Sequence, residues 1–184
     1  MIILTGASAS GKTEVAHSLA RHYGIIKAVT TTSRLPRTGE VNGVDYYFVT
    51  ESKFKELLQE NSFVEHTLYN GNFYGTGKSE VNDSKCLVVD PKGLASFISF
   101  NDPSVVSFLL IAQESTREER MKLRGDNPLD IQKRIATDRI DFDADKIPYS
   151  DFKIVTDSRS IDEIAEDIFE KYQATLRRRG LIHN

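Results

Sequence analysis

A glycine-bounded stretch near the start of the chain decides its fold: Gly6-Ala7-Ser8-Ala9-Ser10-Gly11-Lys12-Thr13. It matches G-x-x-x-x-G-K-[ST] at each fixed position, and in that pattern the glycines let backbone N–H groups turn inward around phosphate oxygens. The apolar run at 2–5 predicts a buried strand before the stretch, and the run at 11–22 predicts an amphipathic helix after it. That helix would point its positive end at a bound phosphate. This context favours a phosphate-binding loop over a glycine turn that merely precedes a helix cap.

Two side chains of this loop carry the chemistry that the pattern predicts. We expect Lys12 to reach the outer phosphates of ATP, and the Thr13 hydroxyl to ligate Mg²⁺, which would be the cofactor. The loop alone does not say what accepts the phosphoryl group. The ATP-binding set expected from the motif is Gly6, Ala7, Ser8, Ala9, Ser10, Gly11, Lys12 and Thr13.

Beyond the loop, apolar strands alternate with amphipathic helices. We expect helices to begin at Thr50 or Ser52, at a capping box over 115–118, at Asn127-Pro128 and at a capping box over 160–163. Such alternation predicts an α/β domain with a doubly wound, mostly parallel sheet that helices cover on both faces. The strands are expected at 28–32, 46–49, 63–69, 85–90, 105–112 and 152–155.

Two segments interrupt the alternation. The mixed segment over about 32–83 predicts an inserted α+β lobe beside a core formed by about 1–31 and 84–184, all within a single domain. The stretch over 124–128 is rich in Arg, Gly, Asp and Asn and lies between two expected helices. It predicts a short helical lid over about 120–139.

The overall composition excludes several classes of protein. A length of 184 residues with 39% hydrophobic and 28% charged residues is ordinary for one soluble domain. The net charge of −3 gives no basic field, so we expect no nucleic-acid partner. Cys86, the only cysteine in the sequence, lies in an apolar run and is expected to be buried. Because no apolar run is long enough for a signal peptide or a membrane span, we expect a cytoplasmic protein without a membrane partner.

A second run also carries chemistry: Arg34-Leu35-Pro36-Arg37-Thr38-Gly39-Glu40-Val41-Asn42-Gly43-Val44-Asp45-Tyr46-Tyr47-Phe48. Two arginines stand three apart across a proline, which restricts the backbone between them. Guanidinium groups bind phosphate bidentately, and a tyrosine hydroxyl adds a donor. Taken alone, the run would be better interpreted as a solvated basic loop. Beside the phosphate loop, it predicts a second phosphate-binding element.

With these residues the chain resembles the guanylate kinase family. The pattern R-x-P-R-x-G-E-V-x-G-x-D-Y-x-F is that family's signature for its nucleoside monophosphate lobe. The resemblance, from Ile2 to about Asp157, implies a P-loop NTPase-type fold and direct in-line transfer of phosphate from ATP to GMP or dGMP, in a monomer or homodimer. Three further pieces follow in the family's order: Phe63-Val64-Glu65, Gly71-Asn72-Phe73-Tyr74-Gly75-Thr76 and Val89-Asp90-Pro91-Lys92-Gly93.

The resemblance also implies roles for individual residues of the lobe. Guanine offers two donors, N1–H and its amine, beside the O6 acceptor, so carboxylates and hydroxyls can read it. Adenine would leave such buried groups unpaired, and a site of this kind rejects a wrong partner by roughly 10⁴-fold. The acceptor's phosphate would be held by Arg34, Arg37, Tyr46 and Tyr74, and the base would be read by Thr30, Glu65, Thr76 and Asp90.

The family places arginines of the lid around the phosphoryl group in transit. The transition state spreads charge over equatorial oxygens, so positive groups must surround it. Helical arginines are more commonly solvated, which is the alternative for each of them. The catalytic set implied by the resemblance is Lys12, Arg34, Arg120, Arg124 and Arg134.

Several positions depart from the family's pattern. Ala7 and Ala9 stand where proline and glycine are usual, Thr156 replaces an asparagine, and Val88 replaces an acid of the strand that ends at Asp90. Read as a generic P-loop strand, that strand makes Asp90 the carboxylate on the Mg²⁺ side. Read by the family's register, it assigns Asp90 to the acceptor base.

Two other functions stay open beside a guanylate kinase. One is a related kinase with another phosphorylated acceptor, and the joint presence of Glu65, Thr76 and Asp90 argues against it. The other is a catalytically weakened, guanylate kinase-like binding module, and the intact Lys12 and Thr13 argue against that.

Overall fold

A parallel sheet of five strands lies at the centre of the structure, a computed structural model that describes residues 1–37, 39–69, 71–143 and 145–182. In the sheet, Ile2 of β1 stands between Cys86 of β7 and Val106 of β8, so the strand that enters the phosphate loop is the central one. Parallel strands end at the same edge, which collects the loops that follow them. The sheet order is β2 (Ile26–Lys27), β7 (Lys85–Val88), β1 (Ile2–Thr5), β8 (Val106–Ile111) and β9 (Phe152–Val155).

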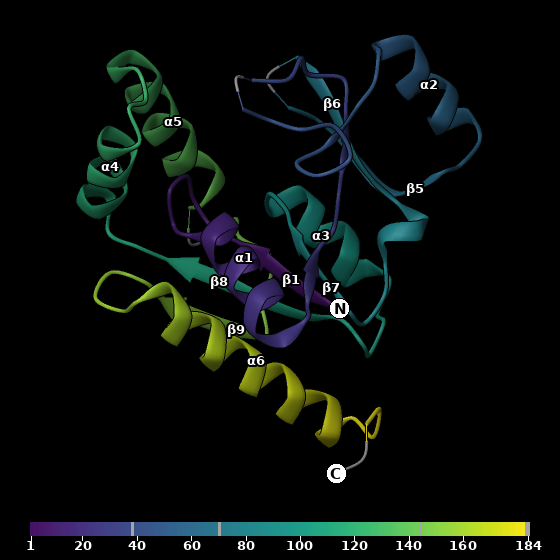
Figure 1. Ribbon diagram of the computed structural model, residues 1–184, viewed down its shortest axis with the longest axis vertical. Helices are drawn as coiled ribbons and strands as arrows, with labels where there is room; N and C mark the ends of the chain where they lie inside the picture. The colour runs from purple at the N-terminus through teal and green to yellow at the C-terminus, as the bar shows by residue number, and fades with distance from the viewer. Residues whose placement is uncertain (38, 70, 144, 183–184) are drawn as a thin grey trace.

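Helices cover both faces of this sheet (Figure 1). Helices α1 (Lys12–Tyr23) and α6 (Ile161–Arg178) pack on one face in a cluster that includes Leu19 and Ile168. Helix α3 (Pro91–Ser99) packs on the other face through Leu94 and Phe97. This confirms the expected α/β fold with a covered parallel sheet.

The inserted lobe has a small mixed sheet of its own, in the order β4 (Tyr47–Phe48), β3 (Thr31–Thr32), β6 (Asn72–Gly77) and β5 (Phe63–Tyr69). Helix α2 (Glu51–Gln59) and a 3₁₀ turn, η1 (Lys78–Glu80), complete it. The ring of Phe54 on α2 stacks on Phe63 and Phe73 of the sheet, at centroid distances of 4.6 and 5.3 Å. The lobe therefore has its own aromatic core, apart from the core of the central sheet.

Two helices lie on the opposite side of the molecule from the lobe, α4 (Glu114–Leu123) and α5 (Pro128–Asp141), and together they contain the segment over about 120–139 that the sequence predicts as a lid (Figure 1). Met121 of α4 and Ile131 and Ile135 of α5 form a third apolar cluster between them. Asn127 caps α5 as predicted, because its side chain accepts from the Leu129 N–H at 2.9 Å.

Two predictions about local structure were wrong. Of the strand expected over 28–32, only Thr31–Thr32 is a strand, β3, and it belongs to the lobe's sheet, whereas β2 of the central sheet already ends at Lys27. Between them the Val29 N–H donates to Glu80 at 3.0 Å, so the chain leaves the central sheet there. The capping box over 115–118 does not begin α4, because the helix already starts at Glu114. The preceding residue, Gln113, donates its N–H to Asp157, and this contact with a distant segment fixes the helix start.

Burial of Cys86 is confirmed, and it raises the pKa of that thiol to about 12. Within the described ranges, none of the helices combines the length and apolar character that crossing a bilayer requires. Thr38, which falls in the signature run over 34–48, lies outside the described residues, as do Asn70, Ala144, His183 and Asn184.

Candidate active site

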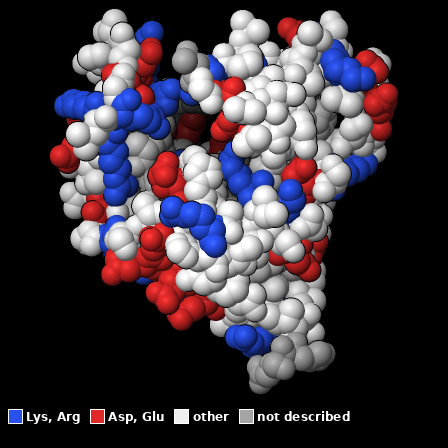
Figure 2. Space-filling model, viewed as in Figure 1, with Lys and Arg blue, Asp and Glu red and all other residues white. Residues whose placement is uncertain are grey.

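A cleft of about 500 Å³ opens between the lid, the lobe and the carboxyl edge of the central sheet. Figure 2 shows this face of the molecule hollowed between the two upper parts, with basic side chains gathered on the lid side. Most residues that the sequence singled out line this one cleft. They are Gly6, Ser8, Ala9, Lys12, Thr13, Thr30, Arg34, Arg37, Tyr46, Glu65, Tyr74, Asp90, Arg124 and Arg134.

The phosphate loop connects β1 to α1 along one wall of the cleft. Gly6 has φ +151°, and a Cβ added there would lie 2.4 Å from the Leu110 carbonyl oxygen, so a side chain has no room. Gly11, with φ +98°, turns the chain into α1. Both ends of the loop thus require the residue that the motif prescribes.

Lys12 lies folded back into its own loop. Its Nζ donates to the carbonyl oxygens of Gly6 at 2.6 Å and Ala7 at 2.9 Å. Burial lowers the pKa of Lys12 to about 8, because the neighbouring Asp138 offsets only part of the desolvation. The ammonium group is therefore held where a phosphate oxygen could replace the loop carbonyls as its partner.

Ala9 adopts a left-handed backbone conformation, with φ 58°. For a residue with a Cβ this costs roughly 1–2 kcal/mol relative to the right-handed region, which explains why glycine is the easier choice there. The Ala9 methyl packs against the apolar cluster of the lid helices. The backbone conformation of Ala9 is thus less favourable than that of a glycine would be, but its methyl group makes an apolar contact that a glycine could not make.

Thr156 supports the loop from the end of β9. Its hydroxyl donates to the Ser10 carbonyl oxygen at 3.1 Å. Arg120 of α4 donates to the Thr156 carbonyl oxygen at 2.7 Å and to the Ala9 carbonyl oxygen at 3.2 Å. Arg120 is therefore bound to the outer side of the loop.

The wall of the cleft that the lobe forms holds the arginine and tyrosine side chains that the sequence predicts to bind the acceptor's phosphate. The Arg34 guanidinium lies over the Tyr46 ring at 5.3 Å from its centroid, and the Tyr46 and Tyr74 rings meet edge to face at 6.1 Å. Glu40 binds the two arginines of the run: its carboxylate accepts from Arg34 Nη2 at 2.8 Å and from the Arg37 N–H at 2.7 Å. The bond to Glu40 raises the pKa of Arg34, so this guanidinium is fixed in position and fully charged.

Deeper in the lobe, carboxylates and hydroxyls form a polar pocket. The Thr76 hydroxyl is fully buried and donates to Glu65 at 2.6 Å. Burial raises the pKa of Glu65, with a contribution from the negative charge of Asp90, while the Thr76 bond partly opposes the shift. Asp90 caps α3 by accepting from the Gly93 N–H at 2.7 Å and still lines the cleft. The capping role and a ligand-binding role are thus compatible.

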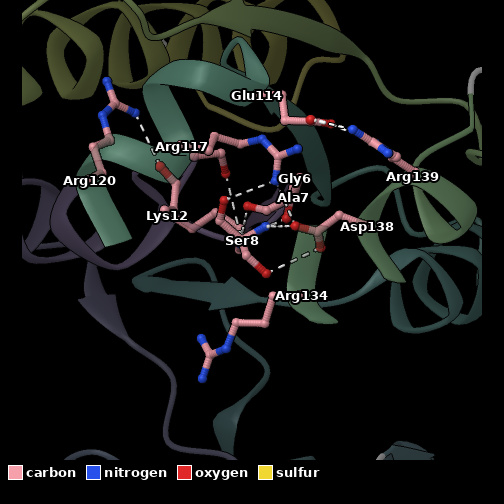
Figure 3. A network of polar contacts seen from close by, with 12 residues as sticks. Gly6, Ala7, Ser8, Lys12, Glu114, Arg117, Arg120, Arg134, Asp138 and Arg139 are labelled. Carbon is pink, nitrogen blue, oxygen red and sulfur yellow. Dashed lines mark hydrogen bonds and ion pairs between the residues drawn. The ribbon is translucent and has the colours of Figure 1, made fainter. Parts of the chain in front are cut away.

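Two arginines of the lid segment line the cleft, and both lie beside the carboxylate of Asp126. Arg124 makes two hydrogen bonds to Asp126, of 2.9 and 2.5 Å, and Arg134 Nη1 lies 3.9 Å from the same side chain. In Figure 3 the Arg134 side chain points away from the phosphate-loop network. Arg139, by contrast, pairs with Glu114 on the exposed side of the lid.

Comparison with known proteins identifies the family. The family model described as guanylate kinase matches residues 1–175. The guanylate kinase of Thermus thermophilus is 30% identical over an alignment that covers 98% of this chain and 83% of the relative. That of Prochlorococcus marinus is 32% identical, covering 94% of this chain and 96% of the relative. The crystal structure of guanylate kinase from Anaplasma phagocytophilum is similar with a TM-score of 0.70 at 26% identity, covering 100% of this chain and 96% of that one.

The chain belongs to the guanylate kinase family.

Some residues that the family resemblance singled out lie beside the cleft rather than on its surface. Thr76 donates its hydroxyl hydrogen to Glu65 from behind the cleft wall, and Arg120 is hydrogen-bonded to Ala9 and Thr156. The loop residues outside the lining are Ala7, Ser10 and Gly11.

Sequence reasoning missed two charged residues at this site, Arg117 and Asp138. Both are buried, and Asp138 lines the cleft. A signal was present in the helical spacing. Asp138 stands three residues after Ile135 on the apolar face of α5, and Arg117 stands four before Met121 on that of α4. A charged residue on an apolar face requires a buried partner.

Proposed function

We propose that this chain transfers the γ-phosphoryl group of ATP to GMP, and to dGMP, giving ADP and the nucleoside diphosphate. The observation that carries the proposal is that one cleft has the phosphate loop on one wall and Glu65 and Asp90 on the other, with Thr76 bonded behind Glu65. Such a cleft would bind two nucleotides with their phosphates directed toward each other. Membership of the guanylate kinase family supports the same acceptor.

The donor end would hold the triphosphate through the backbone N–H groups of the loop, with Lys12 leaving its loop carbonyls for the outer phosphates. Mg²⁺ fits the donors present there. The Thr13 side chain lines the cleft, and no cluster of three metal-binding side chains occurs in the part of the chain that the structure describes. The ion would therefore be held by Thr13 and the nucleotide's own oxygens, as small hard cations often are in kinases. It would supply positive charge that offsets the negative charge on the phosphates during transfer.

The acceptor end would hold the monophosphate through Arg34, Arg37, Tyr46 and Tyr74. Glu40 keeps the first two of these in place and leaves further guanidinium N–H groups for the phosphate. The tyrosine hydroxyls add neutral donors, so the site can bind a phosphate that remains nucleophilic.

The base pocket would select guanine because its carboxylates accept hydrogen bonds from the N1–H and amine groups of that base. Glu65 takes a hydrogen bond from Thr76 and keeps acceptor capacity for N1–H and the amine. Asp90 uses one oxygen to cap α3, and its charge acts on Glu65, so the two carboxylates share one environment. We therefore assign Asp90 to the acceptor base, as the family's register implies, and not to the metal.

Transfer itself would require charge stabilisation more than proton transfer, because the attacking phosphate is already ionised. Arg124 and Arg134 are the lid groups closest to this task, since both line the cleft and are held beside Asp126. We propose that the lobe over about 32–83 and the lid over about 120–139 close on the core of the domain and bring these arginines around the phosphoryl group.

A coupled assay for ADP release tests the proposal, with GMP, dGMP, AMP, CMP and UMP offered in turn. We expect GMP and dGMP to be used, and AMP to be at least 10³-fold poorer in kcat/KM. Equal rates with AMP would contradict the base-reading role of Glu65 and Asp90. Binding of GMP without any ADP release would contradict the kinase and favour a binding module instead.

A further inference from the structure

A buried ion pair lies where the lid meets the phosphate loop (Figure 3). Arg117 Nη1 of α4 is 2.6 Å from Asp138 Oδ2 of α5, and the two side chains are only 7% and 9% exposed. Removing two charges from water is costly, and buried pairs often stabilise a fold no better than apolar residues of the same volume. Stability of the fold alone therefore does not explain this buried pair, and its contacts with neighbouring groups become important.

The pair binds both peptide groups that flank Ser8. Asp138 Oδ2 accepts from the Ser8 N–H at 3.0 Å, and its Oδ1 accepts from the Ser8 hydroxyl at 3.2 Å. Arg117 Nη1 donates to the Ser8 carbonyl oxygen at 3.3 Å. One residue of the phosphate loop is thus held through its N–H, its side chain and its carbonyl group by two helices of the lid.

The next residue is the one in the left-handed conformation. Ala9 is flanked by this clamp on one side, and its own carbonyl oxygen accepts from Arg120 on the other. Its methyl group packs on Met121, Ile131 and Ile135. The lid helices therefore hold the backbone of the loop at Ala9, the position where its left-handed conformation is unfavourable for an alanine.

We propose that Arg117 and Asp138 are positioning residues for the donor nucleotide: they dock the lid on the phosphate loop and hold Ser8 and Ala9 in the shape that receives the outer phosphates. The inference rests on the donor half of the proposed function, an ATP-binding loop, and not on the identity of the acceptor.

The charges make the two members of the pair unequal. Asp138 lines the cleft, so its carboxylate faces the space where phosphates would lie. Arg117 neutralises it. Removing Arg117 alone leaves an unpaired anion beside a bound polyphosphate, whereas removing Asp138 alone leaves a cation there. Loss of Arg117 should therefore weaken donor binding more than loss of Asp138, and removing both should restore part of the affinity.

Calorimetric titration of the full chain tests this, with Mg-ADP and GMP titrated separately. We expect Arg117→Met to weaken ADP at least 20-fold and Asp138→Leu about fivefold, with GMP within twofold of wild type in both. The double variant should bind ADP more tightly than Arg117→Met. Arg139→Met is the matched control: it breaks an exposed pair between the same two helices, away from the loop, and should leave both affinities unchanged.

Three results would overturn the inference. One is ADP affinity within twofold of wild type in both single variants, and another is an equal loss of ADP and GMP binding, which a merely structural role would give. The third is a double variant no better than Arg117→Met. Melting temperatures identify any single variant that fails to fold. In that case the double variant is titrated in its place, and we expect its GMP affinity to stay near that of the wild type. A wild-type chain that binds no ADP would instead contradict the proposed function itself.

Ala9→Gly supplies an independent measurement. A glycine adopts a positive φ without strain, so the loop should depend less on its clamp. We expect the loss of ADP affinity caused by Asp138→Leu to be at least threefold smaller in the Ala9→Gly background. An identical loss in both backgrounds would show that the ion pair does not act on the backbone at Ala9.

Discussion

At the donor end of the cleft phosphates would meet mainly backbone, whereas at the acceptor end they would meet mainly side chains. The donor loop is shaped by Gly6 and Gly11 and by contacts to the lid, and its one charged group, Lys12, is folded into it. The acceptor end relies on Arg34, held by Glu40, and on Glu65, held by Thr76. Under the proposed function, donor binding would therefore depend on the fold around the loop, whereas acceptor choice would depend on a few individual side chains.

The largest expected effect is at Lys12. Lys12→Ala removes the only lysine of the loop, and the charge developing on the outer phosphates then lacks its fixed partner. We expect kcat/KM for ATP to fall by about 10³-fold or more, measured by ADP release. GMP affinity should stay within twofold of wild type, since the acceptor groups belong to the lobe. A comparable loss of GMP binding would break the separation of the two ends.

The next effect is at Glu65 and concerns the acceptor alone. Glu65→Gln keeps a hydrogen-bond acceptor for Thr76 but turns an N–H₂ group toward the donors of guanine. We expect kcat/KM for GMP to fall by about 10²-fold with KM for ATP unchanged. An unchanged preference for GMP over AMP in this variant would remove Glu65 from base reading.

The raised pKa of Glu65 adds a pH dependence with a definite sign. Burial favours the protonated form, so as pH falls this carboxyl loses its acceptor role earlier than an exposed glutamate would. We expect KM for GMP to rise toward low pH in the wild type. Glu65→Gln is the control, because it shares every other titrating group, and its KM should rise less over the same range. Parallel profiles would contradict the assignment.

At the donor end the pH dependence runs the other way. The free protein loses the Lys12 proton above a pKa of about 8, and bound phosphates should raise that pKa. Binding of ADP should therefore take up a proton above pH 8, and the affinity should fall by up to about tenfold per pH unit there. Calorimetry in two buffers of different ionisation enthalpy measures the uptake, and Lys12→Ala should abolish it.

The smallest effect is expected at Glu40, which touches no nucleotide in this account. Glu40→Gln weakens the hold on Arg34 and on the Arg37 N–H, but leaves both arginines in place. The loss of one charge-assisted hydrogen bond is worth about 1.5–3 kcal/mol when buried and less at a partly exposed pair. We expect KM for GMP to rise about five- to tenfold with kcat and KM for ATP unchanged. A change in KM for ATP of the same size would contradict a purely acceptor-side role.

Local sequence signals predicted some elements to the residue and missed others for physical reasons. The strand at Phe63–Tyr69 and the capping box at Ser160 depend on neighbours in the chain, and both were predicted correctly. The segment over 28–32 was wrong because Glu80, distant in sequence, draws the Val29 N–H out of the central sheet. Helix α4 starts early because Asp157 holds Gln113.

The same distinction applies to the cleft. The motif residues were found because their spacing along the chain is itself the signal. Arg117 and Asp138 were missed because they meet only through the packing of α4 on α5, and no short motif joins them. Their places on apolar helix faces were the available clue.

The most direct test of a two-ended cleft is a titration with adenosine and guanosine joined 5′ to 5′ by five phosphates. The account predicts one molecule bound per chain, displacement of both ADP and GMP, and affinity at least 100-fold higher than for the analogue with two adenosines. Displacement of only one of the two nucleotides, or equal affinity for the two analogues, would contradict it.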